Sequence, residues 1–262
     1  MARAAHGGGG MGLLARAALV AFVALVGVGG GARAQLRQNY YGSTCPNAES
    51  TVRSVISQHL QQSFAVGPGT LRLFFHDCFV RTGGPSYSVE LGRLDGKTFN
   101  RAIVKHVLPG PGFNLDQLNS LFASNGLTQT DMIALSGKLL PSCLKISIDR
   151  LGYNPPMNLD FLRSMRRVCP INYSPTAFAM LDVSTPRAFD NAYFNNLRYN
   201  KGLLASDQIL FTDRRSRPTV NLFAANSTAF FDAFVAAMAK LGRIGVKTGS
   251  DGEIRRVCTA VN

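Results

Sequence analysis

The sequence has few acidic residues, and it lacks the motifs by which basic proteins recognise nucleic acid. Only 16% of its 262 residues are charged, and 15 Asp and Glu stand against 28 Lys and Arg, for a formal net charge of +13. It contains no zinc-finger spacing, no RNP motif and no basic stripe interleaved with aromatic residues, so we do not expect nucleic acid as a partner. A C-x-x-C pair and a cluster of Cys with His are also absent, which argues against a zinc site.

Long apolar runs are absent except near the N-terminus. Residues 1–34 combine Arg3 and Arg16 with an apolar run over 17–28 and an A-x-A motif at 32–34. A charged start, a short apolar middle and a small-residue cleavage site are typical of a secretory signal peptide. The run is too short for a membrane anchor, and no other stretch is long enough to cross a bilayer. We therefore expect a secreted protein without a membrane span.

The expected mature protein keeps a strong positive charge. Three arginines lie in the signal peptide, so 25 basic and 15 acidic residues remain, a net charge of +10. Such a charge favours binding to polyanions, and for a secreted protein acidic polysaccharide is the polyanion we expect. Solubility alone explains the charge equally well.

Apolar periodicity predicts that most of the remaining sequence is helical. Apolar residues recur at three- and four-residue spacing, and Asn114 and Thr128 stand where N-caps are expected. Glycines close several of these segments, as is common at helix C-termini. Only 86–93 alternates in the manner of a short strand, so we predict a mainly α fold with little β structure. The expected helices cover 45–64, 70–80, 112–126, 127–137, 157–169, 187–202 and 226–242.

One expected helix places an arginine and a histidine together. In "TLRLFFHDCFV", residues 70–80, Arg72, Phe75 and His76 fall at i, i+3 and i+4 and share one face. A histidine can take a proton from one atom and return it to the next, and an arginine can stabilise negative charge on a departing oxygen. Over a metal centre the pair suits cleavage of a peroxide O–O bond, with Phe75 as a wall of the pocket. Spacing alone leaves a second interpretation open, a partly exposed polar face.

The complete string "RLFFHDCFV" resembles the distal motif of the secreted plant haem peroxidases, the class III family. The resemblance continues in family order through "QLRQNYYGSTCPNAESTVRSVI", "GGPSYSVELGRLDGKT", "LPGPGFNLDQLNSLFASNGLTQTDMIALSG", "LDVSTPRAFDNAYFNNL", "KGLLASDQILFTD" and "TGSDGEIRRVCTAVN". It implies a helical peroxidase domain over 35–262, with haem b and two calcium ions as cofactors. It further implies oxidation of small phenolic donors by hydrogen peroxide, and a monomer exported to the cell wall or, alternatively, to the vacuole.

On the distal side, the resemblance assigns roles to five residues. Arg72 is similar to the distal arginine of the family and His76 to its acid–base histidine. Asp77 and the carbonyl of Val80 match two ligands of the distal calcium ion. Pro85, in "GGPSY", matches a carbonyl that contacts aromatic substrates.

On the proximal side, the resemblance implies a second calcium site, a supporting aspartate and a disulfide. Asp207 is implied to hydrogen-bond the histidine that ligates the iron. Cys143 and Cys169 are implied to pair, while the odd number of five cysteines leaves at least one thiol unpaired. Without the family resemblance, the segment 182–190 fits a capped turn before a helix, and Asp207 fits a helix cap. The implied proximal calcium ligands, oxygens of the kind a hard cation prefers, are Asp182, Thr185, Ala188 by its carbonyl, and Asp190.

Two segments depart from the family pattern. After Val80 the family continues with a Gly-Cys-Asp-Ala-Ser loop and further helices, whereas this chain passes directly to "RTGGPSY". The missing block would hold the other distal calcium ligands, so Asp77 and Val80 leave that site incomplete. The prediction is a peroxidase domain that lacks a block after Val80.

The second departure is an altered segment at about 138–153, where the family has Ala-His-Thr and its iron-ligating histidine. No histidine follows His106, so we identify no haem iron ligand; Lys138 and Cys143 are poor substitutes. A threonine of the proximal calcium site is missing as well, which leaves both calcium sites incomplete. The alternative prediction is therefore an inactive secreted peroxidase-like protein or an aberrant splice product. A third prediction, which rests on net charge alone, is a basic polysaccharide-binding protein.

Overall fold

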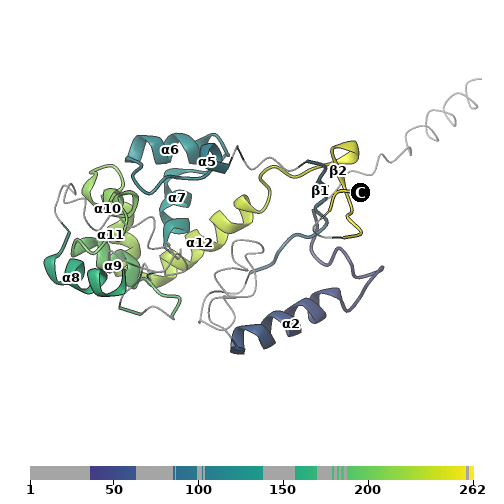
Figure 1. Ribbon diagram of the computed structural model, residues 1–262, viewed down its shortest axis with the longest axis horizontal. Helices are drawn as coiled ribbons and strands as arrows, with labels where there is room; N and C mark the ends of the chain where they lie inside the picture. Colours follow the sequence, from purple (N-terminus) through teal and green to yellow (C-terminus); the bar gives the residue numbers. More distant parts are fainter. Residues whose placement is uncertain are drawn as a thin grey trace, which may run out of the picture. The chain divides into compact units, whose positions relative to one another are not determined.

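Figure 1 shows the computed structural model of the chain. It describes residues 36–62, 85, 87–98, 102, 104–137, 157–169, 179, 182, 184–185, 188–257 and 260–262. These residues are mainly helical and include a sheet of just two short strands, so the predicted mainly α fold with little β structure is confirmed. Contacts divide the described chain into two compact units. The smaller holds Arg93–Thr98 and Lys247–Asn262, and the larger holds Leu36–Gly92 and Phe99–Val246.

The smaller unit is built around the two strands. β1 (Asp95–Gly96) pairs antiparallel with β2 (Gly252–Glu253), which directly follows a short 3-10 helix, η3 (Gly249–Asp251). A bridge between Leu94 and Lys247 extends the pairing. The first residue of β2 is glycine because an added Cβ there would lie 2.5 Å from the Cβ of Leu94.

The strand predicted over 86–93 is wrong. Residues 87–90 form no strand, and Leu91 makes a single bridge with Arg37. Gly92 follows with a φ of 100°, which turns the chain out of the extended conformation. Within this segment, Tyr87 packs against the hydrophobic core and does not form part of a strand.

The larger unit is a group of helices that pack pairwise. α12 lies against α7 and α11, α11 also lies against α9 and α10, and α6 lies against α7 and α10 (Figure 1). Among the described helices none is by itself long and apolar enough to cross a membrane, although α11 and α12, bent by 118°, meet that length and composition as a pair. The helices are α2 (Ala48–Gln62), α5 (Val104–Val107), α6 (Leu115–Ala123), α7 (Gln129–Ser136), α8 (Leu159–Val168), α9 (Ala192–Arg198), α10 (Ala205–Thr212), α11 (Arg217–Ala225) and α12 (Ser227–Leu241).

The starts of α6 and α7 are set by reciprocal caps. The side chain of Asn114 accepts from the backbone N–H of Gln117, whose own side chain accepts from the N–H of Asn114. Thr128 and Asp131 form the same arrangement at α7. Each pair satisfies two N–H groups that a helix start leaves unbonded. The N-caps predicted at Asn114 and Thr128 are confirmed.

Aromatic residues of α12 form the centre of the core. Phe230 is fully buried, and its ring centroid lies 5.2 Å from that of Phe189, 4.9 Å from Phe194 and 5.9 Å from Phe223. Such pairs contribute about 0.5–1.5 kcal/mol each beyond the area they bury. α7 ends against these rings at Gly137, where an added Cβ would lie 3.3 Å from both Phe194 and Phe230. Phe234, one turn further along α12, is buried in the same core.

α10 and α11 have no counterpart among the helices expected from the sequence. Both are short, and the charged "TDRRSR" between them hides their boundaries. α11 starts with a proline in its first turn, where proline is tolerated because the N–H has no partner there. Arg217 then donates to the carbonyls of Phe211 and Thr212 and so satisfies the end of α10.

α2 forms where the periodicity predicts it, but its apolar face is not buried. Val52 is 56% exposed and Val55 48% exposed. In a complete core these side chains would each bury enough area to stabilise the fold by about 1.5–3 kcal/mol. Among the described residues, the apolar face of α2 therefore has no packing partner.

Candidate functional site

The predicted site residues fall into two groups with respect to the described residues. The distal group, Arg72, Phe75, His76, Asp77 and Val80, lies outside them, as does Cys143. Pro85 is described and half-buried. The proximal residues are described, and they form two clusters of buried polar groups.

The first cluster gathers two carboxylates and a hydroxyl before α9. Asp182 is 6% exposed, and its Oδ1 accepts from the backbone N–H groups of Ser184 and Thr185 at 2.9 and 3.2 Å. The Thr185 hydroxyl lies 2.7 Å from Asp182 Oδ2 and 2.9 Å from Asp190 Oδ1. Ala188 closes a turn by donating from its N–H to the carbonyl of Thr185. The structure thus brings the four sequence-predicted residues of this segment together.

The Thr185 hydroxyl cannot satisfy both carboxylates at once. A hydroxyl has one proton, so it donates either to Asp182 or to Asp190, and the other contact joins two oxygens without a proton between them. A bound cation would remove this repulsion, because it accepts lone pairs from the hydroxyl and from both carboxylates. The donor set therefore fits a hard cation such as calcium. No group of three or more His, Cys, Asp or Glu suited to a metal is found among the described residues, so other oxygens would complete the shell.

Asn196 of α9 belongs to this cluster and was not predicted. It is 4% exposed, donates from Nδ2 to Asp182 Oδ1 at 2.9 Å, and accepts from the Ser184 hydroxyl. The sequence carries a signal for it. Asn196 stands three residues after Tyr193 and directly before Leu197, on the apolar stripe of its helix, where a polar side chain needs a partner.

The second cluster pairs a tyrosine with an aspartate from successive helices. The Tyr193 hydroxyl, on α9, donates to Asp207 Oδ1, on α10, at 3.0 Å, and both residues are buried. Asp207 Oδ2 accepts from the backbone N–H of Leu204 at 2.8 Å, which caps α10. Both carboxylate oxygens of Asp207 therefore already have a partner from this chain.

Burial dominates the ionisation of this pair. It raises the pKa of Asp207 to about 7, although the hydrogen bonds from Leu204 and Tyr193 act in the opposite direction. Burial, and then the charge and hydrogen bond of Asp207, raise the pKa of Tyr193 well above its usual value of 10. The phenol consequently keeps its proton and remains the donor to Asp207.

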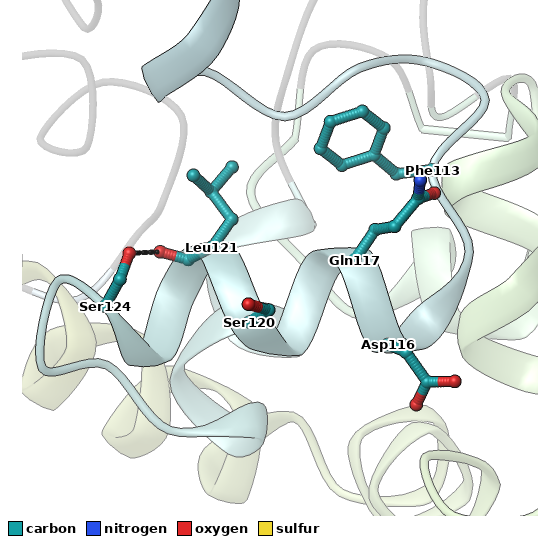
Figure 2. A pocket seen from close by; sticks show the side chains of 6 residues that line it. All are labelled: Phe113, Asp116, Gln117, Ser120, Leu121 and Ser124. Atoms are coloured by element: carbon teal, nitrogen blue, oxygen red, sulfur yellow. Dashed lines mark hydrogen bonds between the residues drawn. The ribbon is translucent and has the colours of Figure 1, made fainter.

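The hollow on the surface of α6 contains none of the predicted site residues. It has a volume of about 530 Å³ and is lined by Phe113, Gln117, Ser120, Leu121 and other residues of one helix face (Figure 2). Its one titratable lining residue, Asp116, is ion-paired with Arg215 and exposed. The hollow therefore offers no arrangement of acid, base or nucleophile.

Comparisons with known proteins decide the family. A sequence model of the family described as "Peroxidase" matches residues 80–226. Peroxidase 45 of Arabidopsis thaliana is 41% identical over an alignment that covers 87% of this chain and 93% of the relative. The chain belongs to the plant haem peroxidase family. Peroxidase 16 of the same species is 40% identical with the same coverage, and a peroxidase of Triticum aestivum is 32% identical over 94% of this chain and 98% of its own.

The length of these alignments shows that the peroxidase chain is shorter than its relatives in places. The alignment with Peroxidase 45 runs over 301 positions, whereas 87% of 262 residues is about 228, so roughly seventy positions are occupied by the relative alone. The placement of the missing block after Val80 and of the altered segment at about 138–153 stays a prediction.

Membership of this family implies haem, so the described residues can be tested as ligands of its iron. His59 and His106 are exposed on α2 and α5, Cys45 is exposed with a free thiol, and Cys169 is disulfide-bonded. An axial ligand has to be buried against the haem with a free electron pair, which none of these offers. On the proximal side, none of the histidines and cysteines among the described residues therefore fits the role of iron ligand. Because Cys45 is free, the partner of Cys169 is one of the cysteines outside the described residues, and its pairing with Cys143 stays a prediction.

Proposed function

We propose that this chain acts as a haem-dependent peroxidase that oxidises small phenolic donors with hydrogen peroxide. The observation that supports this function is its similarity to plant peroxidases over 87% of the chain, together with Arg72 and His76 in "RLFFHDCFV". The resemblance to the family supplies the class of substrate.

The proposed roles concern protons and charge. Hydrogen peroxide gains two electrons and two protons and becomes two water molecules, while two phenols each lose one electron and one proton. His76 accepts a proton from one peroxide oxygen and returns it to the departing oxygen. Arg72 stabilises the negative charge that develops on that departing oxygen. The carbonyl of Pro85 contacts the phenol, and Phe75 restricts the pocket.

The cluster of Asp182, Thr185 and Asp190 before α9 is proposed to hold calcium. Asp182, Thr185 and Asp190 would contribute oxygens from their side chains, and Ala188 would contribute its carbonyl. The shared hydroxyl of Thr185 supports this proposal because it leaves one carboxylate contact without a proton. Asp77 and the carbonyl of Val80 are proposed to belong to a second, incomplete calcium site.

The remaining proposals concern location and assembly. Residues 1–34 would direct the chain to the secretory route, and the peroxidase domain over 35–262 would work as a monomer in the cell wall or, alternatively, in the vacuole. The two arginines before the apolar run and the A-x-A motif support export.

A second candidate function is a secreted peroxidase-like protein that carries no haem. It is favoured by one observation, the hydrogen bond between Tyr193 and Asp207, which occupies the carboxylate that the family resemblance assigns to an iron-ligating histidine. An aberrant splice product would have the same property, and sequencing of the transcript would identify it by the absent coding segments.

One experiment separates the two candidates. Residues 35–262 are expressed, haem and calcium are added, and the Soret band is recorded together with the oxidation of a phenol by hydrogen peroxide. A haem spectrum with turnover is the result expected for the peroxidase. A folded chain, shown by its far-UV circular dichroism, that takes up no haem would overturn the first candidate and leave the second.

A further inference from the structure

The outer face of α8 is basic. On this helix Phe161 and Met165 are buried in the core, whereas Arg163, Arg166 and Arg167 are exposed. The three arginines stand at i, i+3 and i+4 and therefore share the side of the helix that faces away from the core. The three arginines thus lie on the opposite side of the helix from the buried Phe161 and Met165.

Little of this charge is neutralised. Arg163 makes an ion pair of 3.0 Å with Asp160, the one acidic residue of α8, and both side chains are largely exposed. Exposed pairs of this kind contribute about 0–1 kcal/mol and exchange readily with other partners. Arg166 and Arg167 have no ion pair among the described residues. Two to three positive charges are therefore available on one helix face.

The segment at the end of α9 adds positive charge beside the start of α8. The backbone N–H of Asn158, the N-cap of α8, donates to the carbonyl of Asn200 at 2.9 Å, so the start of α8 lies next to the residues that follow α9. Arg198 is exposed and Lys201 half-buried on this segment, and no acidic residue occurs from 191 to 202. We call the set of Arg163, Arg166, Arg167, Arg198 and Lys201 the α8/α9 basic surface.

An exposed aromatic ring lies within this surface. Tyr199 stands between Arg198 and Lys201 and is 66% exposed. A tyrosine ring offers a flat apolar face on which a sugar ring can stack, and its hydroxyl stays in water. Cations alone would suit any anion, but cations around an exposed ring suit an anionic chain of rings.

We propose that the α8/α9 basic surface binds an acidic polysaccharide whose repeating carboxylates pair with its guanidinium groups. Arginine matches a carboxylate with two parallel N–H donors, so a chain of uronic acids would meet several such sites at once. An anionic membrane is disfavoured because the apolar side of α8 is already packed in the core and cannot enter a bilayer. The choice of polysaccharide over nucleic acid rests on the proposed secretion of the chain, but the binding itself does not depend on peroxidase activity.

The test compares two variants of equal charge on the full mature chain. Arg163→Gln/Arg166→Gln/Arg167→Gln removes three charges from the basic surface. Arg53→Gln/Arg214→Gln/Arg256→Gln removes three exposed charges elsewhere, which makes it a matched control. Binding to polygalacturonate is measured at several salt concentrations, with fully methyl-esterified pectin as the uncharged reference. Glutamine has nearly the helix propensity of arginine, so both variants are expected to fold.

The first variant is expected to lose about tenfold in affinity for polygalacturonate, while the control stays close to the parent chain. Equal losses in both variants would mean that net charge alone governs binding and would overturn the proposal. If the first variant unfolds, Arg163→Lys/Arg166→Lys/Arg167→Lys replaces it, with a smaller loss expected from the weaker pairing of lysine with carboxylate.

Single-stranded DNA as a competitor decides the class of ligand. If DNA displaces polygalacturonate at a lower concentration of charges than polygalacturonate itself requires, a polysaccharide site is excluded. Secretion is scored separately from the culture medium, so its failure is distinguishable from a failure of binding.

Discussion

The hydroxyl of Tyr193 donates to Asp207 Oδ1 at 3.0 Å, and both side chains are withdrawn from water. The family resemblance assigns this carboxylate to an iron-ligating histidine. The described residues show it held by a tyrosine and by the first turn of its own helix instead. Tyr193 and Asp207 therefore form a buried polar pair, and this pair has measurable consequences for stability.

Stability is expected to depend on pH through Asp207. Burial raises its pKa from 3.8 to about 7, so between these values the folded chain keeps a proton that the unfolded chain releases. This contribution is fully present below about pH 4 and is lost as the pH rises through 7, by up to about 4 kcal/mol. Asp207→Asn imitates the protonated carboxyl and should remove this slope. Urea unfolding of both chains from pH 4 to 8 measures the difference, and parallel curves would contradict the prediction.

Loss of the Tyr193 hydroxyl should destabilise the chain most at high pH. Tyr193→Phe leaves Asp207 Oδ1 without its donor, and an unpaired buried acceptor costs about 1–3 kcal/mol, more when it is charged. The loss should therefore be larger at pH 8 than at pH 5, where Asp207 is protonated. Thermal unfolding at the two pH values checks this. Tyr199→Phe, at an exposed tyrosine, is the control and should change neither value.

Calcium should stabilise the chain through Asp182, Thr185 and Asp190. A ligand present at a hundred times its dissociation constant stabilises the folded state by about 2.7 kcal/mol. Thr185→Val keeps the size of the side chain but removes the shared oxygen, and we expect it to abolish most of the calcium-dependent rise in melting temperature. Asp251→Asn, at an exposed acid of the other unit, should leave the rise intact. A rise that survives in Thr185→Val would place the cation elsewhere.

The ion pair between Lys240 and Asp131 should link α12 to α7. Lys240 Nζ lies 2.8 Å from Asp131 Oδ2, and Asp131 also caps α7 through Thr128. Burial alone would raise the pKa of Asp131, but the hydrogen bonds from Lys240 and Thr128 outweigh it and hold the pKa below 3.8. Lys240→Met should cost about 1–3 kcal/mol at pH 7 and less at pH 3, because this contribution is lost as Asp131 takes up a proton. Lys97→Met, at an exposed lysine, is expected to have no effect in the same unfolding assay.

His76 should carry the proton transfer of the proposed peroxidase. If the chain turns over hydrogen peroxide, His76→Ala should lower kcat/KM for peroxide by about 10²–10⁴, the usual contribution of a positioned acid–base group. His106→Ala changes an exposed histidine and should leave kcat/KM unchanged. Full activity in His76→Ala would assign the proton transfer to another residue.

Local signals carried most of what the sequence predicted correctly. The starts of α6 and α7 were predicted because a cap depends on a side chain and a backbone N–H within three residues of each other, at Asn114 and Thr128. The family was also predicted, because strings such as "RLFFHDCFV" are specific without reference to any fold. The contacts of the Thr185 hydroxyl with Asp182 and Asp190 are local as well, since they join residues at most five positions apart.

Tertiary structure decided which groups meet and which are buried. Nothing local distinguishes Asp207 as a cap from Asp207 as a partner of Tyr193, because the two residues stand fourteen positions apart and meet only through the packing of α9 on α10. The exposed valines of α2 follow the same rule. Periodicity shows that a helix has an apolar face, but only the presence of a packing partner determines whether that face is removed from water.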